Sequence, residues 1–144
     1  MSIKQISVFL ENRRGKLDEM ARILAEQHID LRALSLAEAQ DFGIARMIVD
    51  DAYAAAAVLK ENSFIANITP VLAYAVPDEP GGLSHLLSAF TAAELNIEYM
   101  YAFLGGKDSD HAYMIFRLTD SEKAESALAA QGFRSLTQEE ISAI

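Results

Sequence analysis

The hydrophobic and polar positions along the first half of the chain change their period several times. Ile6, Val8 and Leu10 alternate with other residues, which is the period of a half-buried strand. Apolar side chains then recur every three or four residues from Leu17 to Leu24, as on one face of a helix. The pattern after this helix predicts strands at 31–40 and 44–50, a short alanine-rich helix at about 51–61, and a strand at 64–69.

The same succession of signals repeats after 66 residues. Gly15 aligns with Gly81, and the apolar positions of the following helix agree, since Leu17 meets Leu83. The second copy then carries a four-residue insertion at about 105–108, after which the two copies align again. The second copy predicts strands at 71–76, 97–104, 111–119 and 133–136, a helix after Gly82, a helix at 121–130 behind the N-cap Asp120, and a short terminal helix opened by a Thr137–Glu140 capping box.

Two βαββαβ units in a row predict an α+β fold of the ferredoxin-like type. Each unit is expected to be an antiparallel sheet with both helices on one face. Because Pro70 leads directly into the next strand, we expect modules at 1–70 and 71–144 with almost no linker. A module of about 70 residues is marginally stable alone, and edge strands invite pairing. We therefore expect a homodimer or an assembly of dimers, joined through strand edges or through helix faces.

The composition narrows the function classes. The chain has 12 Lys and Arg against 21 Asp and Glu, a formal net charge of −9, which argues against nucleic-acid and anionic membrane partners. It has no cysteine, and its three histidines lack metal-ligand spacing, so we expect no metal and no cofactor. Without a signal core or an apolar stretch of membrane-spanning length, a soluble cytoplasmic protein is expected.

Two turns in equivalent places carry the candidate chemistry. Segments 11–17 and 77–83 each lead from a strand through glycine into the start of a helix. Free N–H groups and the helix dipole suit an anion there, and glycine lets a ligand approach the backbone closely. An amino-acid carboxylate fits this description, and Asn12 or Asp78 is placed to accept from its ammonium group. The alternative is an ordinary turn in which Asn12 or Asp78 caps its own helix.

The motif D-x-P-G-G-L at 78–83, followed by LNIEYM at 95–100, resembles the ACT domain. The resemblance spans both copies and is closest to small stand-alone double-ACT proteins. It implies a non-catalytic regulatory protein that senses a free amino acid, commonly bound at interfaces between modules, and that controls a metabolic enzyme. The ligand-binding positions that the resemblance implies are Asn12, Gly15, Lys16, Leu17, Asp78, Gly81, Gly82, Leu83, Asn96, Tyr99 and Tyr101.

The first turn departs from the family pattern in two places. Arg14 stands where the family has proline, and Asn12 replaces the more usual aspartate. Either this site is degenerate, or Arg13 and Arg14 add positive charge for a carboxylate. The overall negative charge repels acidic ligands at long range, so a neutral amino acid is expected.

Two other function classes stay open. A docking subunit without a ligand would use the edge strands and the acidic surface, and a small ferredoxin-like enzyme is the less favoured alternative. No G-x-S-x-G, P-loop or H-E-x-x-H motif is present. Ser84 and His85 are adjacent, and adjacent helical side chains do not face each other. His85 is either a ligand contact or a partly exposed helix residue.

Overall fold

A computed structural model describes residues 2–104 and 110–144, so the expected insertion at 105–108 lies outside the described residues. The chain divides into two compact units. The first unit is Lys4–Thr69, and the second consists of residues 2–3 and Pro70–Ile144. Within the described residues, no helix is both long enough and apolar enough to cross a membrane.

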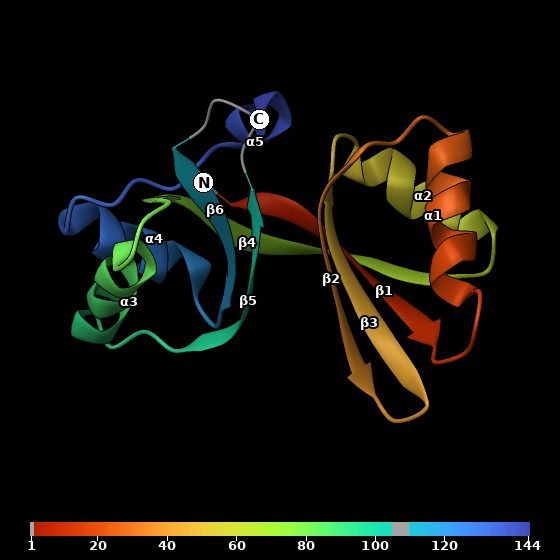
Figure 1. Ribbon diagram of the computed structural model, residues 1–144, viewed down its shortest axis with the longest axis horizontal. Helices are drawn as coiled ribbons and strands as arrows, with labels where there is room; N and C mark the ends of the chain where they lie inside the picture. Colours follow the sequence, from red (N-terminus) through yellow and green to blue (C-terminus); the bar gives the residue numbers. More distant parts are fainter. Residues whose placement is uncertain (1, 105–109) are drawn as a thin grey trace. The chain divides into compact units, whose positions relative to one another are not determined.

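The first unit is a twisted antiparallel sheet with two helices on one face (Figure 1). Its strands follow the order β2-β3-β1-β4. Buried side chains of β1 and β3 pack against those of both helices, including Met20 and Leu59, and form one hydrophobic core. The elements are β1 (Ile3–Glu11), α1 (Lys16–Glu26), β2 (Leu31–Ala39), β3 (Phe42–Val49), α2 (Ala52–Glu61) and the first part of β4 (Ile65–Pro77).

The second unit also has two helices packed against an antiparallel sheet and has a core of its own, but its strands in the described residues are three, in the order β4-β6-β5. In this core the Tyr74 ring meets the rings of Phe90 and Phe116 edge-on, and the ring centroids of Phe90 and Phe116 lie 4.7 Å apart. The remaining elements are α3 (Gly82–Ala92), β5 (Ile97–Leu104), β6 (His111–Leu118), α4 (Ser121–Ala130) and α5 (Gln138–Ala143). The expected α+β fold of two ferredoxin-like modules is therefore confirmed.

Two strand predictions are wrong in detail. The strands expected at 64–69 and 71–76 form one strand, β4, which continues through Pro70. Proline is compatible with extended backbone where no N–H is needed, and its carbonyl accepts from Arg117 Nη1 at 2.8 Å. Residues 133–136 are not a strand. A single backbone bond, from Leu136 N–H to the Ala73 carbonyl, replaces the expected ladder.

The helix starts follow the predicted capping chemistry. Asp51 and Asp120 accept hydrogen bonds from the backbone N–H groups of Ala54 and Lys123. Thr137 and Glu140 form the predicted capping box at the start of α5. These bonds satisfy N–H groups that a helix start otherwise leaves without partners.

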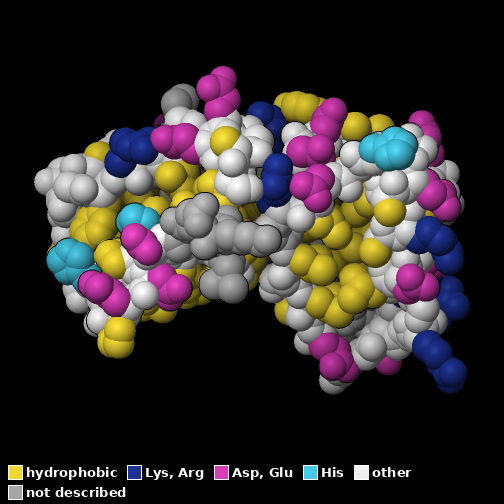
Figure 2. Space-filling model, turned by 45° about the horizontal axis from the view of Figure 1, so that its top comes forward, with side chains coloured by type: hydrophobic (Ala, Val, Ile, Leu, Met, Phe, Trp, Pro, Cys, Tyr) yellow, Lys and Arg dark blue, Asp and Glu magenta, His cyan; other side chains and the backbone are white. Residues whose placement is uncertain are grey.

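Large hydrophobic side chains remain exposed on the first unit, where Figure 2 shows hydrophobic atoms gathered on the surface. Their positions matter because extended exposed apolar areas mark binding sites. The exposed large hydrophobic residues are Phe9, Leu34, Leu36, Phe42, Tyr53 and Ile65.

Gly82, at the start of α3, has no room for a side chain. A Cβ atom at this position would lie against the Pro77 carbonyl oxygen, well inside contact distance. Replacing Gly82 by alanine is therefore expected to lower the free energy of unfolding by about 1–3 kcal/mol, as overpacking usually does. Urea unfolding beside Ser84→Ala, an exposed change on the same helix, measures the effect; equal stability of the two variants would contradict it.

Candidate functional site

The two strand–helix turns have the same backbone construction. Gly15 and Gly81 precede α1 and α3 with φ of 87° and 91°, which favours glycine. The N–H of Asn12 donates to Asp41 O at 2.9 Å, and that of Asp78 donates to Asp110 O at 2.8 Å. Each turn is thus tied to the hairpin that follows its helix. The repeat in the sequence corresponds to a repeat in three dimensions.

Neither turn residue caps its helix. The caps of α1 and α3 are glycines without a side-chain hydrogen bond. Asn12 Nδ2 instead donates to Glu38 Oε1 at 2.6 Å and to the Gln40 carbonyl at 3.0 Å. The capping role expected of Asn12 or Asp78 is therefore wrong, and an ordinary strand–helix turn stays the alternative to a ligand site.

The first turn borders a cavity of about 220 Å³ on the helix side of the sheet. Gly43 pairs with Leu10 on one neighbouring strand and with Glu38 on the other, and paired residues point to the same face. A Cβ atom at Gly43 would lie 3.3 Å from Leu36 Cδ1, so Leu36 packs over this glycine beside the cavity. The lining residues are Leu10, Glu11, Asn12, Arg13, Lys16, Leu17, Leu36, Glu38 and Gly43.

The cavity wall combines both signs of charge with apolar surface. Lys16 Nζ lies 3.2 Å from Glu19 Oε2 and 5.1 Å from the centre of the Phe64 ring. Arg13 Nε lies 2.8 Å from Glu11 Oε2, but both side chains are more than half exposed, so solvent screens this pair. Cations and carboxylates at one small apolar cavity are the groups that a zwitterion needs.

Three of the implied ligand-binding residues, Asn12, Lys16 and Leu17, line this cavity, and Gly15 lies beside it in the turn. The sequence did not single out Leu36, Glu38 or Gly43. Leu36 pairs with the core residue Ala45, so β2 turns Leu36 and Glu38 toward the helix side. Leu36 and Glu38 are two residues apart on a predicted strand, so the sequence indicates that they share a face. It identifies that face only when the pairing register is known.

The second turn is placed differently relative to its other implied residues. Asp78 and Gly81 are exposed, Gly82 is buried, and Leu83 borders a shallow groove along α3. Asn96 is exposed immediately before β5.

The strand tyrosines point away from that turn. Tyr99 and Tyr101 flank Met100, which packs against the core under the helices. Because neighbouring strand residues alternate between faces, the two tyrosines lie on the opposite face of the sheet. The second unit alone does not bring them together with Asp78–Leu83.

His85 extends from the exposed side of α3 and contacts an aromatic ring. Its ring centroid lies 5.3 Å from that of Phe133. The side chain is thus partly exposed and packed within its own unit, as one of the two sequence hypotheses expected.

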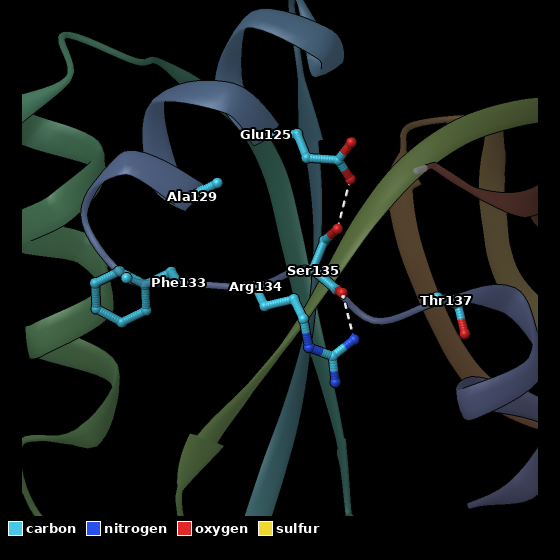
Figure 3. Close-up of a pocket in the computed structure, with 7 residues that line it drawn as sticks. Glu125, Ala129, Phe133, Arg134, Ser135 and Thr137 are labelled. Carbon is cyan, nitrogen blue, oxygen red and sulfur yellow. Dashed lines mark hydrogen bonds between the residues drawn. The ribbon is translucent and has the colours of Figure 1, made fainter.

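A larger cavity of about 410 Å³ lies in the second unit, around the end of α4 (Figure 3). In both cavities the charged groups have internal partners; here Glu125 accepts from Ser135 Oγ, and Arg134 holds both carboxylate oxygens of Glu140. The two cavities differ in the helix end that they adjoin, and the negative end of the α4 dipole disfavours a carboxylate. The first-unit cavity adjoins the start of α1 and is therefore the better match for an amino acid.

Glu140 is expected to make the folding stability of the second unit depend on pH. The Arg134 guanidinium, with the Thr137 N–H at 2.7 Å, lowers the pKa of Glu140 from 4.5 to about 2. A lowered pKa stabilises the folded state above pH 4.5, and this stabilisation is lost as pH falls through 2. Glu140→Gln should lower the melting temperature at pH 7, with the deficit shrinking on acidification across that range. Glu139→Gln is the control, and a deficit independent of pH would contradict the assignment.

Metal-dependent or tyrosine-based catalysis would place specific demands on the described residues. Among residues 2–104 and 110–144, no group of three or more His, Cys, Asp and Glu side chains is arranged to hold a metal ion. Burial, together with the negative charge of Glu125, raises the pKa of Tyr74, so this core hydroxyl stays protonated at neutral pH. Its oxygen has no hydrogen-bond partner in the described structure.

Comparison with known proteins identifies the class. The model of the ACT domain pair family matches residues 1–144, and the chain belongs to that family. A crystal structure of a protein from Bacteroides thetaiotaomicron has 37% sequence identity and a TM-score of 0.92, covering 100% of this chain and 98% of the other. The ligand-free regulatory subunit of aspartate kinase from Thermus thermophilus has the same fold, with 18% identity, a TM-score of 0.66 and 88% coverage of each chain. None of the curated proteins compared matches the chain.

Proposed function

We propose that this protein is a non-catalytic regulatory protein that binds a free, neutral amino acid in the first-unit cavity at the β1–α1 turn. The observation that carries the proposal is the cavity itself. Both signs of charge, three leucines and the start of a helix meet in about 220 Å³. That volume is below the range of drug-sized pockets and suits a small metabolite.

The charges suggest how the ligand lies. Lys16 and the first N–H groups of α1 would hold the carboxylate. Glu38, already oriented by Asn12, would accept from the ammonium group. Leu10, Leu17 and Leu36 would contact the ligand's apolar part, which supports a neutral rather than an acidic amino acid.

The second turn is an additional candidate position. It has the same backbone and glycine conformation as the first, and α3 has no acidic residue in its first turn to compete with an anion. Asp78, Gly81, Gly82 and Leu83 would supply the turn side of such a site. Asn96, Tyr99 and Tyr101 would have to contact a ligand from another ACT module.

We propose further that the protein forms a homodimer through β2. This strand ends the strand order, and its Leu34 and Leu36 side chains are 43% and 51% exposed. A long apolar edge strand is a template for pairing. Twofold antiparallel pairing centred on Ser35 would set Leu34 opposite Leu36, and Arg32 opposite Glu38, of the other molecule. The relatives that are regulatory subunits of aspartate kinase suggest a metabolic enzyme as the partner that the dimer regulates.

Thermal shift with a panel of single amino acids tests the sensor function. A ligand at one hundred times its dissociation constant adds about 2.7 kcal/mol to the free energy of unfolding. We expect stabilisation by neutral amino acids and none by aspartate or glutamate. A protein stabilised by none of them would instead be the docking subunit or the enzyme.

A further inference from the structure

The face of the first-unit sheet that points away from the helices carries an apolar patch. Phe9 lies between two core residues of β1, so its side chain points to this outer face. Ile65 lies between two core residues of β4 and points the same way. Ile44 pairs with Phe9, and Phe42 lies two residues before Ile44 on β3, with its ring centroid 5.6 Å from that of Phe9. We call these four residues the outer-face patch.

The outer-face patch leaves much of its apolar surface in water. Phe9 and Phe42 are each 43% exposed, Ile65 is 65% exposed, and Ile44 is half-buried. Together they expose roughly 300 Å² of apolar surface, which is within the range of patches that are often functional on monomers. The hydrophobic effect favours covering such a surface.

The outer face has no net charge at the positions that the pairing register defines. Among the residues that this register places on the outer face, only Glu11 and Arg46 are charged, and their charges cancel. The chain as a whole has a net charge of −9, so two copies repel each other at long range. A face without net charge opposes contact between two copies least, which favours a second copy as the occupant.

The outer-face patch of one molecule is too small to hold a second molecule alone. Two patches in contact would bury roughly 600 Å², and specific interfaces bury about 1,200 Å² or more. The proposed β2 pairing doubles the area, because an antiparallel pair of strands is symmetrical about an axis perpendicular to the sheet. The patches of both molecules then lie on the same side of one continuous sheet, and two such sheets would bury roughly 1,200 Å².

The sizes of the side chains also suit the stacking of two joined sheets. β2 contributes Ala33, Ser35 and Ala37 to the outer face, as their pairing with β3 shows. In the joined sheet these small residues of both molecules form a shallow strip between the two patches. Large side chains of one sheet can pack over small side chains of another, as they do where two sheets form one core.

We propose that the outer-face patch is the surface through which two β2-paired homodimers stack, sheet against sheet, into a tetramer. The inference rests on the homodimer of the proposed function. Tetramers built from two twofold dimers are common among homo-oligomers. Because the buried area is at the lower limit for a specific interface, we expect the tetramer only at higher concentrations than the dimer.

Sedimentation of the full chain over a wide concentration range tests the stacking. We expect the parent protein to pass from a dimer to an assembly of four 15.8-kDa chains as its concentration rises. Phe42→Ser and Ile65→Ser should each raise the dissociation constant of the tetramer by about a hundredfold or more, because four copies of the side chain are lost at once, and should leave the dimer intact. Retention of the dimer shows that each variant folds. Tyr53→Ser is the control, since Tyr53 is an exposed aromatic residue on α2, outside the outer face.

The outcomes separate the stacking from the homodimer. A parent protein that stays a dimer at all concentrations overturns the stacking and leaves the homodimer in place. The stacking is equally wrong if Phe42→Ser and Ile65→Ser form tetramers as stable as those of the parent, or if Tyr53→Ser weakens the tetramer as much as they do. If Leu34→Lys removes the dimer and the tetramer together, the stacking depends on β2 pairing as inferred. If Leu34→Lys leaves a dimer that the added change Phe42→Ser dissociates, the stacking of β2-paired dimers and the proposed homodimer are both wrong.

Discussion

Replacement of Lys16 by methionine is expected to weaken binding of a neutral amino acid by roughly ten- to a hundredfold. A hydrogen bond to a charged group contributes about 1.5–3 kcal/mol, and methionine keeps the apolar stem while removing the ammonium. Lys16 is mostly shielded from solvent, so its interaction with a carboxylate is weakly screened. Isothermal titration of the parent and the variant with the same amino acid measures the loss.

Lys60→Met is the matched control for the charge itself. Lys60 lies in the last turn of α2 and does not line the first-unit cavity. Both variants change the net charge equally, so a long-range effect of the negative protein would weaken binding in both. Equal affinities of Lys16→Met and Lys60→Met would exclude Lys16 as the carboxylate contact.

Replacement of Leu34 by lysine should raise the dissociation constant of the homodimer by about a hundredfold or more. In the proposed β2 pairing, Leu34 is buried against Leu36 of the other molecule, and burying an unpaired charge costs several kcal/mol. Sedimentation at several concentrations should show the variant as a monomer of 15.8 kDa where the parent is a dimer.

Tyr53→Lys controls for this change, because Tyr53 is an exposed residue on α2 and not on β2, and its ring centroid lies 5.5 Å from Lys4 Nζ of β1. It should leave the dimer intact. A dimer that survives Leu34→Lys, or dissociates equally in both variants, would show that helix faces or another surface joins the molecules.

Local signals in the sequence were enough to predict most elements. Hydrophobic period and capping residues depend on neighbours within a few positions, and the helix at 121–130 behind Asp120 is found as expected. The strand expected at 133–136 failed because its apolar residues suit several conformations. Arg134 and Ser135 bond to carboxylates on α5 and α4, six and ten residues away in the sequence, and hydrophobic period does not record such side-chain bonds.

The candidate site, too, was predictable from the sequence only where it depends on local signals. Its turn is local, so Asn12, Lys16 and Leu17 could be named from the motif alone. The far wall of the first-unit cavity depends on strand register, which sets Glu38 and Leu10 on either side of Gly43. The face to which a strand side chain points follows from this register, and the repeat in the sequence did not provide it.

The most direct test compares equivalent substitutions in the two turns. Asn12→Ala and Asp78→Ala remove corresponding side chains, and each is titrated with the neutral amino acid that stabilises the parent in the thermal-shift panel. Binding at the first turn predicts that Asn12→Ala lowers affinity about fivefold or more, since Glu38 loses its orienting bond, while Asp78→Ala binds like the parent. If Asp78→Ala loses affinity while Asn12→Ala binds like the parent, the result contradicts binding at the first turn and places the ligand at the second turn.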